Sequence, residues 1–354
     1  MSLETIGISL GGGPFIPWQD VAINISTEEA VRTATVRGHL PEGMSPPWPD
    51  SKATLSASGD LLLTGYVRDL RADQGESDWS AEISLVSRTV DAVEASIKHS
   101  TGLAKNKDLK GIAEEFDSSG VGVEVVGTYD KIERHQVEPG ESLFSTLEPL
   151  ARSAGAIIHD TPQGKLRIVK RPDAAHAGGL AAGVNIIRAT AEFSGQGRFD
   201  PVLVRGQQSR GEGAQALRPE AEASDPSVGR FRPKIIVLDN EATVANLKKA
   251  TEWHMRVAAG LAVSATVTVS GWRDAGGTIW TPNRLVYVRH PRIFLDQMMG
   301  IKSVSLTQET GSGGSGTRAT LALVDPRALG GSSSGARSGS GWSAPEPSAE
   351  YRAE

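Results

Sequence analysis

The sequence predicts an α+β protein that is mainly β, in which two β-rich regions flank a small α+β unit. Short segments that alternate apolar and polar side chains gather toward both ends of the chain, and stretches with helical periodicity lie between them. The chain also has 40 glycines and 19 prolines, which is typical of many turns and therefore of many short strands. Its 354 residues favour two or three domains.

The first β-rich region covers residues 1–95. A proline-rich stretch at 41–49 predicts a loop, because proline cannot donate a ladder hydrogen bond. Gly59 predicts the turn of a hairpin. Strands of this length and spacing are typical of a small barrel or a sandwich. The predicted strands are 21–26, 34–40, 53–58, 61–70 and 81–87.

The middle region, 96–185, has an α+β pattern. Asp108 can cap a first helix whose apolar side chains share one face. A second helix follows Ser142 and contains Pro149, which should kink it or shift its start. The apolar face of the first helix consists of Leu109, Ile112, Ala113 and Phe116. The strands of a following hairpin are 156–160 and 165–170.

The second β-rich region covers residues 186–328. Its polar stretch at 207–229 predicts a mobile loop. The longest helix is expected near 241–260, with a narrow apolar stripe on one side and Trp253 on the other. Such a helix should be covered twice, with another subunit as one candidate for the second cover. The predicted strands are 186–193, 201–206, 234–238, 262–270, 284–289, 300–307 and 317–323.

The two ends of the chain predict neither a membrane anchor nor a signal peptide. Residues 329–354 are rich in Ser, Gly and Ala, so they bury too little apolar surface to offset their ordering entropy and are expected to be disordered. The first four residues lack a basic segment followed by an apolar run. No segment approaches the roughly 18 consecutive apolar residues of a membrane span.

Composition excludes several classes of function. Lys and Arg total 37 against 42 Asp and Glu, a net charge of −5, which argues against a protein that binds nucleic acid through a basic surface. The absence of cysteine excludes disulfides, zinc–thiolate sites, iron–sulfur clusters and cysteine nucleophiles.

Two sequence patterns associated with catalysis occur in the wrong context. Gly311, Gly313 and Gly316 fit the dinucleotide pattern, but they lie between two predicted strands instead of a strand and a helix. Ser333 lies in a nucleophile-elbow pattern inside the low-complexity tail, where no strained strand–turn–helix is expected. Both matches are interpreted as coincidences.

No residue is predicted to be catalytic, cofactor-binding or metal-ligating. The histidines lack metal-ligand spacing. The neighbouring carboxylates Glu28 and Glu29, like Glu114 and Glu115, point in different directions on a strand or a helix. A glycosidase pair of carboxylates that meet only in the folded chain stays open. The seven histidines are His39, His99, His135, His159, His176, His254 and His290.

Two tryptophans flank a predicted strand–turn–strand segment. Trp272 and Trp280 could anchor a protein interface, or they could belong to the core of the second β-rich region. The core interpretation is favoured. A β-rich chain of several domains without an evident reactive site suits an assembly component better than an enzyme.

An ordered series of motifs resembles the Mu-like phage baseplate hub proteins, a tail hub family related to the hubs of contractile injection systems. The resemblance covers about residues 5–328, and the order and spacing of the motifs carry it. Further matching segments lie at 87–96, 137–143, 150–155 and 164–166. The motifs are Thr64-Gly65-Tyr66-Val67, Val204-Arg205-Gly206-Gln207, Gly271-Trp272-Arg273-Asp274 and Leu321-Ala322-Leu323-Val324-Asp325-Pro326.

The resemblance implies a structural hub and no enzyme. The expected chain has a β-barrel domain at 1–95, an α+β domain at 96–185, a second β-barrel domain at 186–328 and a tail at 329–354. Three chains would form a homotrimeric ring that adapts a six-fold tail tube to a three-fold spike and lets DNA pass without binding it. No cofactor or metal is implied. The protein would sit in the virion tail baseplate after assembly in the host cytoplasm.

Two other functions stay open at this point. The run Pro139-Gly140-Glu141-Ser142-Leu143 is similar to the start of a LysM-type glycan module, which would suit a peptidoglycan-binding or cell-wall-degrading tail protein. A carbohydrate-binding or carbohydrate-processing enzyme on a β scaffold would need a pocket with two converging carboxylates.

Overall fold

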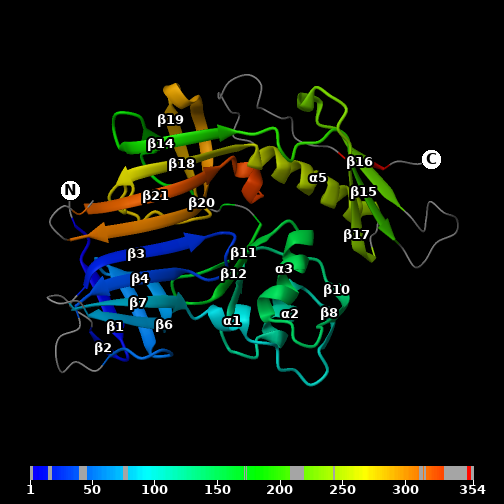
Figure 1. Cartoon of the computed structure of the whole chain (residues 1–354). Helices are drawn as coiled ribbons and strands as arrows, with labels where there is room; N and C mark the ends of the chain where they lie inside the picture. The colour runs from blue at the N-terminus through cyan, green and yellow to red at the C-terminus, as the bar shows by residue number, and fades with distance from the viewer. Residues whose placement is uncertain are drawn as a thin grey trace.

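The computed structural model is mainly β with few helices, as the sequence predicts (Figure 1). A large antiparallel sheet contains strands from both β-rich regions, and two smaller units lie beside it. The model describes residues 3–14, 18–39, 46–74, 79–170, 172, 174–207, 219–241, 244–310, 314, 316–330 and 349–351.

The first β unit contains the strands predicted near the N-terminus and two short ones that were not predicted, β1 and β2. Gly59, at a φ of +94°, makes the turn between β5 and β6 as expected. Gly65 lies where β6 meets β7 so closely that a Cβ would stand 1.8 Å from the Val86 carbonyl oxygen. The strands are β1 (Ile6–Leu10), β2 (Gly13–Pro14), β3 (Trp18–Ser26), β4 (Thr33–Gly38), β5 (Lys52–Ala57), β6 (Asp60–Gln74) and β7 (Trp79–Ser87).

The second β unit contains the strands predicted between 186 and 323, apart from those near 201–206 and 234–238. Its β20 begins earlier than expected, at Leu295, and its side chains alternate between buried and partly exposed along most of its length. The strands are β13 (Leu180–Ala181), β14 (Ile186–Phe193), β18 (Val263–Ser270), β19 (Leu285–His290), β20 (Leu295–Glu309) and β21 (Gly316–Val324).

The two β units have the same strand order. The first runs β3-β4-β7-β6-β5 and the second β14-β18-β21-β20-β19, with the same succession along the chain. Register shifts recur at matching places, in β3 and β14 and again in β6 and β20. The aligned strands β4 and β18 even share the pattern Thr/Ser-Ala-Thr-Val. The described ladders leave both units open, and one ladder between β3 and β20 joins them.

The middle unit confirms both predicted helices. The Asp108 side chain accepts the Gly111 N–H at the start of α2, and the four predicted apolar residues of that helix are buried. Ser142 caps α3, which continues through Pro149. The elements are α1 (Val90–Glu94), β8 (Leu103–Lys107), α2 (Leu109–Phe116), β9 (Val123–Val125), β10 (Ile132–Gln136), α3 (Leu143–Ser153), β11 (Ile157–Asp160) and β12 (Leu166–Val169).

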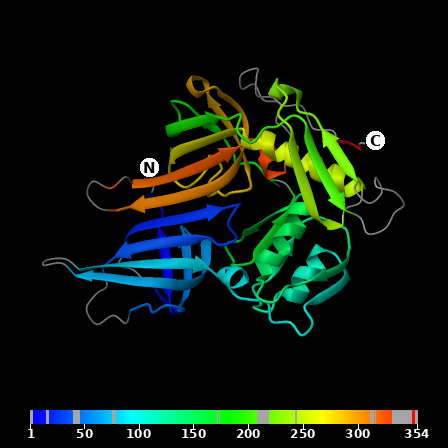
Figure 2. The ribbon, with the colours of Figure 1, turned by 45° about the vertical axis from the view of Figure 1, so that its right-hand side comes forward.

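A separate sheet-and-helix unit lies between strands of the second β unit in sequence, and Figure 2 shows it beyond the end of the large sheet. Part of the predicted loop 207–229 is ordered, because β16 pairs with β15; residues 208–218 lie outside the described residues. The elements are β15 (Val202–Gln207), β16 (Glu220–Ala223), η1 (Pro226–Val228), β17 (Lys234–Glu241), α5 (Val244–Leu261) and β22 (Ala349–Tyr351).

Helix α5 is covered on two sides, as predicted, but by parts of its own chain. Leu247 and Met255 join the core of the sheet-and-helix unit. Trp253 faces the other way, and its ring lies against Gly155 of the middle unit. A further cover comes from η3 (Pro326–Leu329). The second cover therefore needs no other subunit.

Part of the C-terminal tail forms a strand, which the sequence did not predict. Ala349–Tyr351 forms β22 and pairs with β16. Residues 331–348, including Ser333 of the elbow pattern, lie outside the described residues.

A buried ion pair fixes the middle unit to the first β unit. Arg32 precedes β4, and its Nε donates to Asp160 Oδ2 at 2.7 Å while Nη2 donates to Oδ1 at 3.1 Å. Both side chains are at most 3% exposed. Because each charge has left water, neither can lose its partner without a large desolvation cost.

The substitution Asp160→Asn should lower the free energy of unfolding by about 3 kcal/mol, because it leaves the buried Arg32 charge without a carboxylate. Urea unfolding followed by tryptophan fluorescence measures this. The exposed pair Arg37–Glu82 provides the control, since Glu82→Gln should cost less than about 1 kcal/mol. Equal losses in the two variants would contradict a structural role for the buried pair.

Candidate functional site

The junction between the two β units is the best-organised polar site of the chain. Its frame is the antiparallel ladder between β3 and β20, which pairs Asp20 with Glu309 at one end and Ser26 with Ser303 at the other. Buried side chains of both units form one continuous hydrophobic core across it. Side chains near the ends of these strands are therefore held in fixed positions.

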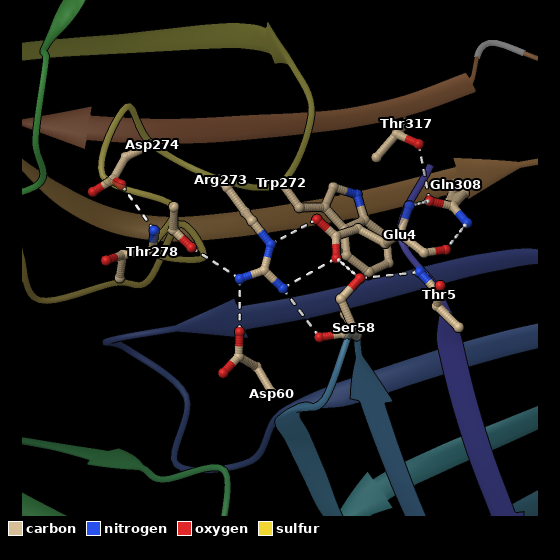
Figure 3. Close-up of polar contacts among 12 residues, drawn as sticks. Glu4, Thr5, Ser58, Asp60, Trp272, Arg273, Asp274, Thr278, Gln308 and Thr317 are labelled. Carbon is tan, nitrogen blue, oxygen red and sulfur yellow. Dashed lines mark hydrogen bonds and ion pairs between the residues drawn. The ribbon is translucent and has the colours of Figure 1, made fainter. Parts of the chain in front are cut away.

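Arg273 is the centre of the junction (Figure 3). It follows β18, and its guanidinium reaches into the first β unit. Nε donates to Glu4 Oε1 at 2.8 Å, Nη2 donates to Glu4 Oε2 at 3.1 Å, and Nη1 donates to Asp60 Oδ2 at 2.6 Å. The carbonyl oxygens of Ala57 and Gly277 accept the remaining bonds. The planar fork of arginine suits such two-pronged binding of a carboxylate.

Glu4 is held from several sides (Figure 3). Its backbone N–H donates to Gln308 Oε1 at 3.0 Å, and Gln308 Nε2 donates back to the Glu4 carbonyl oxygen at 2.9 Å. The Thr317 hydroxyl donates to the same Gln308 Oε1, and the Ser58 hydroxyl donates to Glu4 Oε2 at 2.6 Å. The segment before β1 is thereby tied to β20 and β21 of the second β unit.

The charges of this site stabilise each other. The hydrogen bond from Arg273 is the main reason that the pKa of Glu4 lies below its ordinary value, against the opposing effect of burial. The hydrogen bond to Glu4 likewise raises the pKa of Arg273. Both groups are therefore charged at neutral pH, and the site is an ion-pair network rather than a proton donor or acceptor.

Asp274 organises the turn that presents Arg273. Burial disfavours its charge, but the N–H groups of Ala177, Gly276 and Thr278 and the ring of His176 donate to it, so its pKa lies below the ordinary value. Burial also lowers the pKa of His176, which keeps the ring neutral.

The His176–Asp274 pair lacks the arrangement of a general base. His176 Nδ1 lies 2.8 Å from Asp274 Oδ2, and the Thr281 N–H donates to Nε2 at 3.2 Å. A catalytic histidine must have one ring nitrogen ready to accept a proton from a substrate or nucleophile. Here both nitrogens are engaged within the protein, so the pair holds the turn in place.

Trp272 and Trp280 belong to the core, as the favoured interpretation predicts. Both are at most 2% exposed, and Trp272 Nε1 donates to the Thr307 carbonyl oxygen at 3.0 Å. Three residues of the motif Gly271-Trp272-Arg273-Asp274 therefore have different structural roles. Trp272 anchors the segment in the core, Arg273 crosses to the first β unit and Asp274 shapes the turn.

The other polar residues considered from sequence do not converge. Glu28 pairs with Lys302, Glu114 with Lys110 and Glu115 with Lys107, each at a different place. Among the described residues, no group of three or more His, Asp or Glu is placed to hold a metal ion. Of the glycines in the dinucleotide-like pattern, Gly316 begins β21, and Gly311 and Gly313 lie outside the described residues.

The segment compared with a glycan module has a structural use. Ser142 caps helix α3, and Leu143 is buried in the core of the middle unit. A β-hairpin, β11 and β12, follows this helix directly. In the described part of the chain, no helix is long and apolar enough to cross a membrane.

Sequence reasoning missed most partners in the junction. Arg273 lies in a quoted motif, but Glu4, Asp60 and Gln308 carry no local signal. Glu4 and Gln308 are 304 residues apart. Only the strand pairing brings them together, so no spacing rule could have identified them.

The substitution Glu4→Gln should lower the free energy of unfolding at neutral pH by about 1–3 kcal/mol, because it removes a charged acceptor from Arg273. The pKa of Glu4 is lowered in the folded chain, so its contribution is present above the unfolded pKa and disappears as the pH falls through the folded pKa. Urea unfolding over a pH series should show the two proteins converging in acid. Glu124→Gln, in an exposed pair, is the control. A pH-independent difference would contradict this role of Glu4.

Two family models match separate parts of the chain. Residues 89–170 match the second domain of the gp44-like baseplate hub proteins, and residues 243–330 match the fourth domain of the Mu phage baseplate assembly protein GpP. The first match covers the middle unit. The second covers α5 and most of the second β unit, including Arg273.

Similar proteins extend over most of the chain. The baseplate hub protein gp44 of Escherichia phage Mu is 25% identical over 303 residues, which cover 80% of this chain and 79% of that protein. The 43 kDa tail protein of prophage MuSo2 from Shewanella oneidensis has a TM-score of 0.82 at 27% identity, over 92% of this chain and 99% of that one.

A more distant structure shares the fold. The E. coli c3393 protein, a component of the type VI secretion system, has a TM-score of 0.57 at 8% identity, over 88% of this chain and 74% of that one. The resemblance found in the sequence motifs is thus confirmed by family models, by a whole-chain relative and by solved structures. Over most of its length, the chain is thus similar to the Mu-like phage baseplate hub proteins.

Proposed function

We propose that three copies of this chain form a closed ring that adapts a six-fold tail tube to a three-fold spike. In this ring the first and second β units of each chain alternate, and each is a barrel-like module. The duplicated strand order is the observation that supports the proposal. Three chains with two similar β units each would present six similar units to the six-fold tube. The same ring would keep three-fold symmetry toward the spike.

The junction supports the same proposal. The β3–β20 ladder and the Arg273–Glu4 pair hold the two units side by side, so their spacing is fixed within each chain. An adaptor needs this rigidity, because a mobile pair of units could not match a regular tube. The domain arrangement proposed is a first β unit, a middle unit and a second β unit that carries the sheet-and-helix unit as an insertion.

The ring would surround a channel through which DNA passes without specific binding. The chain has a net charge of −5, and an acidic wall repels phosphate. The proposed location is the virion tail baseplate, with tube and spike proteins as partners and assembly in the host cytoplasm. We propose no catalytic role, since the buried His176–Asp274 pair and the Arg273 network serve to hold the fold.

Light scattering coupled to size-exclusion chromatography tests the ring. The expected mass is three times the chain mass of 37.3 kDa, with the trimer fraction rising with concentration if the ring is weak. Arg273→Met should reduce the trimer fraction, because it loosens the two units within each chain. A wild-type chain that stays monomeric up to millimolar concentration would contradict the proposal.

A further inference from the structure

We infer that an intermolecular β-ladder joins neighbouring copies in the ring, between β6 at Leu70–Gln74 of one chain and β14 at Ala189–Phe193 of the next. The inference rests on the proposed ring and specifies its contact. It would repeat between chains the β20–β3 ladder that already exists within each chain.

The first step is the equivalence of β6 and β20. Each is a 15-residue strand. On one edge, the early part of β6 pairs with β5 and the early part of β20 pairs with β19. On the other edge, β6 pairs with β7 and β20 pairs with β21. The register shift at Val67/Asp69 matches the one at Ile301/Ser303. Asp69–Gln74 thus corresponds to Ser303–Gln308, the part of β20 that pairs with β3.

The second step is the equivalence of β14 and β3. Both are the first strand of their unit and pair with the second, β18 or β4. Their register shifts, at Ile186/Arg188 and Trp18/Asp20, coincide when β18 is aligned with β4. Ala191 then corresponds to Ile23, and Glu192 to Asn24.

The third step is that β3 and β20 pair with each other within the chain, whereas their counterparts β14 and β6 do not. Strand β3 has a neighbour on each edge, β4 and β20, whereas among the described residues the only strand ladder of β14 is with β18. The late part of β6 likewise has β7 on one edge and no described strand on the other. Its Arg71 and Asp73 side chains are 74% and 61% exposed. Uncovered strand edges readily pair with another chain.

The transferred register places opposite charges together. In the chain, Ser305 pairs with Asn24, so between chains Arg71 would pair with Glu192. Asp73 would lie opposite Thr190 and diagonally next to Arg188. Cross-strand pairs of opposite charge stabilise an antiparallel ladder, and like charges directly opposite destabilise it.

The other face of the same register is apolar. Leu70 would pair with Phe193, and Ala72 with Ala191, in the places that Val304 with Ile25 and Leu306 with Ile23 occupy within the chain. Three of these side chains, Leu70, Ala191 and Phe193, already pack at the margin of the large core, and Ala72 is exposed in the single chain. The ladder would extend that core from one chain to the next.

The contact is head-to-tail, because β6 and β14 are different strands that belong to different β units. A second copy is therefore the occupant that both edges fit. The edge of β6 corresponds to the edge of β20, and the edge of β14 corresponds to the edge of β3. Repeated around a three-fold axis, this head-to-tail contact would close the proposed ring.

Disulfide cross-linking tests the ladder directly, since the chain has no cysteine of its own. The double variant Ala72→Cys with Ala191→Cys should give dimers and trimers on non-reducing gels after oxidation, because directly opposed antiparallel residues lie about 4.5–5.5 Å apart between Cα atoms. Asn24→Cys with Ser305→Cys is the positive control, which should close within one chain. Ala72→Cys with Thr190→Cys, on opposite faces, is the negative control.

Charge exchange gives an independent readout. Arg71→Glu should lower the trimer fraction at least several-fold, and Arg71→Glu with Glu192→Arg should restore it. The matched control exchanges the internal pair, Arg37→Glu with Glu82→Arg, and should leave the trimer fraction unchanged. Circular dichroism of each variant separates loss of assembly from loss of folding.

The outcomes distinguish the ladder from the ring. Cross-linking at 72/191 together with rescue by the double charge exchange supports the ladder. A wild-type trimer that forms without either result overturns the ladder and leaves the proposed ring intact. A wild-type chain that never trimerises overturns the ring and the ladder with it.

Discussion

The ladder between β3 and β20 is the interaction on which the rest of the structure depends. It unites strands from opposite ends of the chain in one antiparallel sheet and lets a single hydrophobic core run through both β units. Without it, the late part of β20 would present an uncovered edge to water. The Arg273–Glu4 network locks the same boundary, and the buried Arg32–Asp160 pair fixes the middle unit beside it.

Two similar β units in one chain can pair with each other through only one pair of strand edges. The β3–β20 ladder uses one edge of each unit, so the equivalent edges, on β14 and β6, are left without this pairing within the chain. Among the described residues the structure has this form, because β3 has a strand on each edge and its counterpart β14 forms a strand ladder on one edge. A protein with such a repeated edge is suited to association in a ring, where the same contact recurs between chains. This is the physical link between the duplicated fold and the proposed role of an adaptor.

Local features were predictable from sequence, and long-range ones were not. Asp108 and Ser142 cap the predicted helices, and Gly59 makes the predicted turn, because each effect acts within a few residues. The pattern cannot reveal that Glu4 meets Arg273, since a buried, paired carboxylate looks like an exposed one in sequence. Strand β16 was missed because its inward residues, Ala221 and Ala223, give a weak apolar signal. Trp253 was correctly placed on a second covered face, but its cover is the chain's own middle unit.

The central claim is that two alike β units per chain form a ring of six similar units from three chains. A cryo-electron microscopy reconstruction of the purified assembly, calculated without imposed symmetry, tests it most directly. The account predicts three-fold symmetry overall and six β units at near-equal angular spacing. A two-fold dimer, or a three-fold particle whose first and second β units lie at different radii, would contradict it.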